Sequence, residues 1–169
     1  MKKGFEMKKP VSFSRPSRLI VGIAYAAGAW AFLFALLSFF WAAGGKTGLH
    51  EFEIEKPDAF LYATNLIAAV LKVVAGLIAL ALVQPWGKRI PRWMLITSAC
   101  VAGAIFILHG LYSILGDILV IVGVVPISEP TNSKWRLLDL YLWGPWWLLG
   151  GILFALVLWL TWRYRRARV

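Results

Sequence analysis

The fold is decided by the apolar stretch at residues 60–83, FLYATNLIAAVLKVVAGLIALALV, in which Lys72 is the only charged residue. About 20 apolar residues are enough to cross the ~30 Å hydrocarbon layer of a bilayer. Similar stretches occur at residues 19–43, 94–125 and 137–162. The sequence therefore predicts an all-α fold, an integral membrane bundle of four transmembrane helices arranged up-down-up-down.

The composition leaves little room for anything besides these spans. Charged residues make up 15% of the chain, whereas a soluble domain carries about 25%. We therefore expect one transmembrane domain and no separate water-soluble catalytic domain. The expected organisation is a basic tail at residues 1–18, a domain at residues 19–162 with spans at about 19–43, 60–83, 94–117 and 137–162, and a basic tail at residues 163–169.

The basic residues predict the orientation of the bundle. Four crossings place both tails and the second loop on one side, and Lys and Arg near helix ends favour the cytoplasmic side. We therefore expect cytoplasmic N and C termini and a multi-pass location in the cell membrane. Because such residues also attract anionic headgroups, we expect membrane lipids as partners and no nucleic acid. The residues concerned are Lys2, Lys3, Lys8, Lys9, Arg15, Arg18, Lys88, Arg89, Arg92, Arg163, Arg165, Arg166 and Arg168.

The connections predict two further features of the bundle. The turn at residues 84–91 is short and carries two prolines, so it should make the second and third helices antiparallel neighbours. The stretch at residues 94–125 would extend ~48 Å as one straight helix, and must therefore tilt, break or change direction. We expect a break at Gly116-Asp117, because Gly weakens a helix and Asp is costly in hydrocarbon.

Polar residues inside the spans are the main functional candidates. Lys72 lies ~18 Å along the second helix, where a charge must face the bundle interior, water or a counter-ion. His109 and Asp117 share one face of the third helix, and Asp117 is the expected partner of Lys72. Asn65 lies two turns from Lys72, and Asp139 begins the fourth helix, where it can favour the positive helix N-terminus.

Tryptophans form a second group of candidates. Six of them lie at span ends, which is typical of interfacial anchoring; these are Trp41, Trp86, Trp93, Trp135, Trp159 and Trp162. Trp143, Trp146 and Trp147 lie inside the fourth helix beside Gly144-Pro145. Because proline kinks a helix, these rings either line a cavity for an apolar or cationic ligand or simply pack.

No short motif for a known chemistry is present, and we expect no metal and no cofactor. The charged groups therefore leave a structural and a functional interpretation open. In the first, Lys72 pairs with Asp117 or with a backbone carbonyl, and His109 makes an interhelical hydrogen bond. In the second, they line a pocket that handles protons or a lipid headgroup. The candidate catalytic residues are Lys72, His109, Asp117 and Asp139; the candidate ligand-binding residues are Trp41, Asn65, Lys72, His109, Asp117, Asp139, Trp143 and Trp146.

Several short motifs resemble those of domain-of-unknown-function family 3995, a group of small bacterial four-helix membrane proteins. The chain has Trp-x-x-Gly-Gly-x-x-Gly at residues 41–48, Gly116-Asp117, Leu138-Asp139 and Pro145 after Trp143-Gly144. Members often carry histidine three residues before the first Trp, where this chain has Ser38. The resemblance implies a bacterial plasma membrane and groups these motifs at the outer side. It implies no reaction.

These observations lead to one preferred function and two alternatives. The preferred function is a non-enzymatic membrane protein that binds a lipophilic molecule or a membrane partner in an outer-half cavity. The first alternative is a membrane enzyme that uses His109 or Asp117 for acid–base chemistry on a lipid or isoprenoid, with Lys72 tuning their charge. The second is a subunit of an oligomeric transporter or channel.

Overall fold

The computed structural model describes residues 17–45, 47, 59–125 and 133–166. Over these residues the chain is helical, as predicted, and its elements follow one another as α1 (Arg18–Ala42), α2 (Ala59–Ala81), η1 (Pro85–Arg89), α3 (Arg92–Ile121), α4 (Ser133–Leu138), η2 (Asp139–Trp143) and α5 (Gly144–Arg166). Residues 1–16 of the first predicted tail and residues 167–169 of the second lie outside the described residues.

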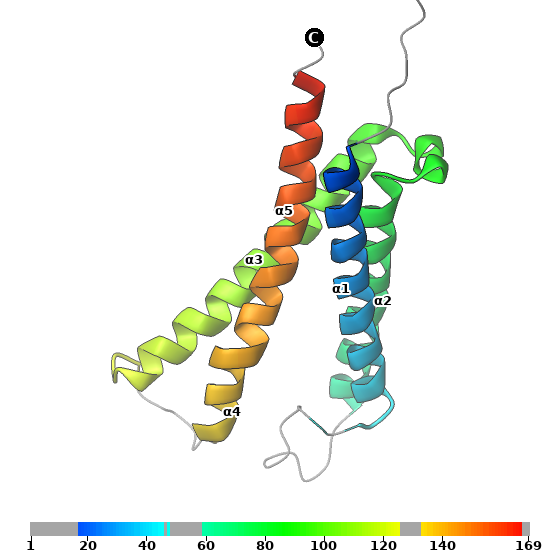
Figure 1. The fold of residues 1–169 in the computed structure, drawn as a ribbon. Helices are drawn as coiled ribbons and strands as arrows, with labels where there is room; N and C mark the ends of the chain where they lie inside the picture. The colour runs from blue at the N-terminus through cyan, green and yellow to red at the C-terminus, as the bar shows by residue number, and fades with distance from the viewer. Residues whose placement is uncertain (1–16, 46, 48–58, 126–132, 167–169) are drawn as a thin grey trace, which may run out of the picture.

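Four helical segments are long and apolar enough to cross a membrane: α1, α2, α3 and the stretch Arg136–Tyr164, which includes α5. They alternate in direction along the chain, so that η1 and the C-terminal part of α5 lie at one end of the bundle and α4 lies at the other (Figure 1). We call these the η1 end and the α4 end. The arrangement confirms the four predicted spans.

The helices pack as two pairs, α1 with α2 and α3 with α5, and α1 joins the pairs by packing on α5. The α3–α5 contact is close because Gly110 has no side chain. A Cβ placed there would lie 2.8 Å from the carbonyl oxygen of Gly144 and 2.9 Å from the nitrogen of Leu148. The short η1 connection brings α2 and α3 together only near their linked ends, and α3 then inclines away from α1 and α2 toward the α4 end (Figure 1).

The predicted break at Gly116-Asp117 was wrong, because α3 continues through both residues to Ile121. One glycine costs a helix only about 1 kcal/mol, and the Asp117 carboxylate has a cationic partner, Arg136. The excess length is accommodated by the tilt of α3 (Figure 1). The helix ends just before Gly123, whose φ of 77° is a conformation that other residues rarely adopt.

The helix that contains the fourth span begins earlier than predicted, at Ser133, and is helical without a gap to Arg166. Asp139 therefore lies inside the helix and not at its start. Its carbonyl accepts the backbone N–H of Gly144 in a π-helical turn, η2. Pro145 follows at once and has no N–H to donate, which favours such a widened turn. The local irregularity expected at the proline thus takes the form of a π-helix, a feature often found at functional sites.

Candidate functional site

Lys72 lies inside the bundle, about 20 Å from the start of α2, and only 4% of the residue is exposed. Its ammonium donates a hydrogen bond to the Ser38 hydroxyl of α1 over 2.7 Å. The same nitrogen lies 3.7 Å from the ring centroid of Phe34 and 4.8 Å from that of Trp147. The charge is therefore enclosed by α1 and α5, between a hydroxyl and two aromatic rings.

These contacts compensate the burial of the charge only in part. A desolvated cation–π contact contributes about 2 kcal/mol, while the effective penalty of burying an ion amounts to several kcal/mol. An ammonium has three N–H donors, and the hydroxyl of Ser38 accepts one. Within the described part of the chain, no carboxylate lies within ion-pair distance of Lys72. The predicted Lys72–Asp117 pair was wrong, because Asp117 pairs with Arg136 instead.

Four tryptophans surround Phe34 next to this lysine. The Phe34 ring centroid lies 4.7 Å from that of Trp147, 5.5 Å from that of Trp30 and 6.3 Å from those of Trp143 and Trp146. The indole N–H groups of Trp30, Trp143 and Trp146 are buried and donate no hydrogen bond to a described residue. Indole N–H groups usually find an acceptor when buried, so three such donors in one cluster are unusual.

Trp41 extends this cluster toward the α4 end. Its ring centroid lies 5.2 Å from that of Trp143, and its indole N–H donates to the Thr47 carbonyl over 2.9 Å. The structure thus brings together four of the predicted ligand-binding residues, which are Trp41, Lys72, Trp143 and Trp146. We call these four, with Trp30, Phe34, Ser38 and Trp147, the Lys72 cluster.

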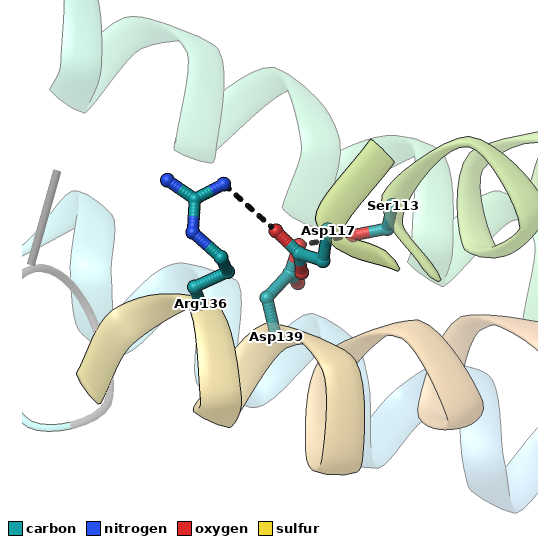
Figure 2. A network of polar contacts seen from close by, with 4 residues as sticks. All are labelled: Ser113, Asp117, Arg136 and Asp139. Atoms are coloured by element: carbon teal, nitrogen blue, oxygen red, sulfur yellow. Dashed lines mark hydrogen bonds and ion pairs between the residues drawn. The ribbon is translucent and has the colours of Figure 1, made fainter. Parts of the chain in front are cut away.

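A second polar group lies where α3 meets α4 and η2 (Figure 2). Arg136 Nη1 lies 3.7 Å from Asp117 Oδ1, and each side chain is 14% exposed. The Ser113 hydroxyl donates to Asp139 Oδ2. Figure 2 shows the two carboxyl groups side by side, with the guanidinium on one flank and the hydroxyl on the other. We call these four residues the carboxylate network.

His109 lies on α3 and contacts Trp147 of the Lys72 cluster. Its ring centroid is 4.1 Å from that of Trp147, and its side chain is exposed on the bundle surface. It also lies within electrostatic range of Lys72 and Asp139. Among the described residues, no hydrogen bond or ion pair joins His109 to Asp117.

Asn65 is the predicted site residue that stays apart. Its side-chain amide donates to the Leu61 carbonyl of its own helix over 3.0 Å. This bond holds the amide against the α2 backbone. A ligand role for Asn65 stays a prediction.

Three members of the cluster were not among the functional candidates predicted from the sequence; these are Trp30, Phe34 and Ser38. Two signals were available in residues 18–42. Trp30 lies mid-span, unlike the interfacial tryptophans, and Ser38 is the only serine of this apolar helix. A polar residue in mid-span faces the protein interior more often than lipid. Phe34 carries no such signal, because phenylalanine is equally common on lipid-facing surfaces.

Comparison with known protein families assigns the chain to one of them. The model of a family described as "Protein of unknown function (DUF3995)" matches residues 31–154. The chain belongs to the DUF3995 family. Neither a curated protein nor a solved structure gives a match. The part of this DUF3995 protein that the family model covers includes the carboxylate network and every residue of the Lys72 cluster except Trp30.

Proposed function

We propose that this protein is a membrane-embedded binding protein that holds the polar group of a lipophilic molecule in the Lys72 cluster. The observation that carries the proposal is the burial of Lys72 without a carboxylate partner among the described residues. Intramembrane charges are retained at a cost in stability and usually serve a function. A bound polar group would supply the contacts that Ser38, Phe34 and Trp147 leave incomplete.

Exposure decreases from His109 through Trp147 to Lys72, and this order supports the entry of a ligand from the lipid phase. His109 is exposed, Trp147 is half-buried against it, and Lys72 is buried beyond Trp147. The inclination of α3 away from α2 separates these helices toward the α4 end (Figure 1). A molecule in the bilayer could therefore meet His109 first and Lys72 last without leaving the hydrocarbon layer.

The two alternatives receive less support from the described residues. Acid–base chemistry needs two groups that reach the same reacting atom, and His109 and Asp117 make no contact with each other. A transport function would require a pore shared between several chains, since one chain with four membrane-spanning helices is thin for a pore. We therefore retain binding as the proposed function.

Native mass spectrometry from a mild detergent tests the proposal. The wild-type protein should retain a lipophilic molecule from the membrane. Lys72→Met should lose it, and Lys88→Met, which removes a charge from the exposed η1 turn, should keep it. A wild-type protein that carries no bound molecule, and gains none when membrane lipids are added back, would refute the proposed function.

A further inference from the structure

The Lys72 cluster offers hydrogen-bond donors and few acceptors. The ammonium of Lys72 has two N–H groups left after its bond to Ser38. Three indole N–H groups of the tryptophans around Phe34, those of Trp30, Trp143 and Trp146, have no acceptor among the described residues. Lysine and tryptophan side chains donate hydrogen bonds and accept none. The Lys72 ammonium and the three indoles therefore all lack an acceptor, and one group that accepts several hydrogen bonds would provide it.

We propose that the polar group bound there is an oxyanion, a carboxylate or a phosphate, carried by a lipophilic molecule. The inference rests on the proposed function and adds the chemical class of the ligand. An ionised carboxylate or phosphate only accepts hydrogen bonds, so it complements a set of donors. It also neutralises Lys72, and hydrogen bonds between ionised groups are about twice as strong as neutral ones.

A cationic ligand, which an aromatic cluster by itself would favour, fits this site poorly. The Lys72 ammonium already lies over the Phe34 and Trp147 rings, at 3.7 and 4.8 Å from their centroids. A second cation would meet that charge in a region of low dielectric constant, where repulsion is strong. The expectation of an apolar or cationic ligand from the tryptophans alone is thus replaced by an anionic one.

The burial of the site favours an amphiphile over a free anion. Lys72 is 4% exposed and lies about 20 Å along a membrane-spanning helix. A free phosphate would have to leave water to reach it, whereas an acidic amphiphile can approach along the bilayer past His109. Both sources present the same oxyanion, so the experiment must separate them.

The test measures thermal unfolding of the full chain in dodecyl maltoside micelles. The probes are dodecyl phosphate, dodecanoate, dodecyltrimethylammonium and inorganic phosphate. At a hundredfold excess over Kd, each of the two acidic amphiphiles should raise the Tm of the wild type by about 5–10 °C. The dodecyltrimethylammonium cation should not raise it. Equal stabilisation by inorganic phosphate would support the oxyanion site and identify a free anion as its source.

Two variants, each with a matched control, locate the effect. Lys72→Met should weaken dodecyl phosphate binding at least about 30-fold, and Lys88→Met should leave it unchanged. Trp146→Phe keeps a ring and removes one donor, so it should weaken binding about tenfold; Trp159→Phe, on an exposed position of α5, should not. If Lys72→Met fails to fold, the comparison of Trp146→Phe with its control Trp159→Phe tests the inference instead.

Two results would overturn the inference. One is stabilisation by the cation or by neutral lipids alone, and the other is an acidic-amphiphile effect that survives both Lys72→Met and Trp146→Phe. In the first case a ligand still binds and the proposed function stands. Failure of the proposed function has a different signature, a wild-type protein that binds no lipophilic molecule at all.

Discussion

The two polar regions of this bundle differ in how many of their charged and hydrogen-bonding groups have partners among the described residues. In the carboxylate network, Asp117 faces Arg136 and Asp139 accepts from Ser113. In the Lys72 cluster, a buried cation meets one hydroxyl and aromatic rings, and three indole N–H groups have no acceptor. The network balances most of its charge by contacts of its own, which join α3 to α4 and η2, although Asp117 Oδ2 is buried and accepts no hydrogen bond from a described residue. The cluster leaves these donors without a partner among the described residues, which is the basis of the proposed ligand site.

The packing of α3 also differs between the two regions. This difference gives the largest expected effect on the free energy of unfolding. Next to His109, a Cβ on Gly110 would lie 2.8 Å from a backbone atom of α5, while next to Asp117 nothing lies within 4 Å of one on Gly116. Gly110→Ala should therefore lower the free energy of unfolding by about 3 kcal/mol through overpacking. Gly116→Ala should not lower it. Denaturant or thermal unfolding in detergent measures both, and equal losses would show that α3 does not pack closely on α5.

Removing the cation from each region tests the comparison itself. Arg136→Met leaves two adjacent carboxyl groups without their cation and should cost about 2 kcal/mol. In protein washed free of lipid, Lys72→Met should cost nothing or should stabilise, because an apolar side chain replaces a buried charge without a counter-ion. Thermal unfolding of both variants gives the comparison. A larger loss for Lys72→Met than for Arg136→Met would contradict it.

A smaller effect is expected for the contact between Lys72 and Ser38. Ser38→Ala removes the hydroxyl that accepts from the ammonium and should cost about 1 kcal/mol in the wild type. The same change should cost much less in the Lys72→Met background, since no ammonium is then present to lose its acceptor. A double-mutant cycle by thermal unfolding measures this coupling, and additive losses would mean that the two side chains do not interact.

The sequence was sufficient to predict the spans but not the partners inside them. Hydropathy depends on local composition, so the bounds of α1 and α2 agree with residues 19–43 and 60–83 to within two residues. The partner of Lys72 depends on which helix faces which. The short η1 turn suggested α2 beside α3, whereas α2 packs mainly on α1 and α3 on α5. In that arrangement, Lys72 bonds to Ser38 of α1, and Asp117 of α3 forms an ion pair with Arg136 of α4.

Two of the corrections have a common physical origin. Gly116-Asp117 was expected to break α3 because Gly and Asp were judged by their cost in isolation. Asp139 was expected to begin the fourth helix because it lies at the start of the apolar stretch at residues 137–162, where a carboxylate favours the helix N-terminus. The contacts with Arg136 and Ser113 lower that cost, and both are made by residues distant in the sequence. Tertiary contacts of this kind override local propensity, and they cannot be read from the sequence of a single helix.

The central claim is that Lys72 holds an acidic group, and an experimental structure of the protein with bound dodecyl phosphate tests it most directly. The quantity to measure is the distance from Lys72 Nζ to the nearest phosphate oxygen. We expect a hydrogen bond of about 2.7–3.2 Å, with at least one indole N–H of Trp30, Trp143 or Trp146 on the same phosphate. A phosphate bound at Arg136 or at another basic residue, with Lys72 still bonded only to Ser38, would contradict the account.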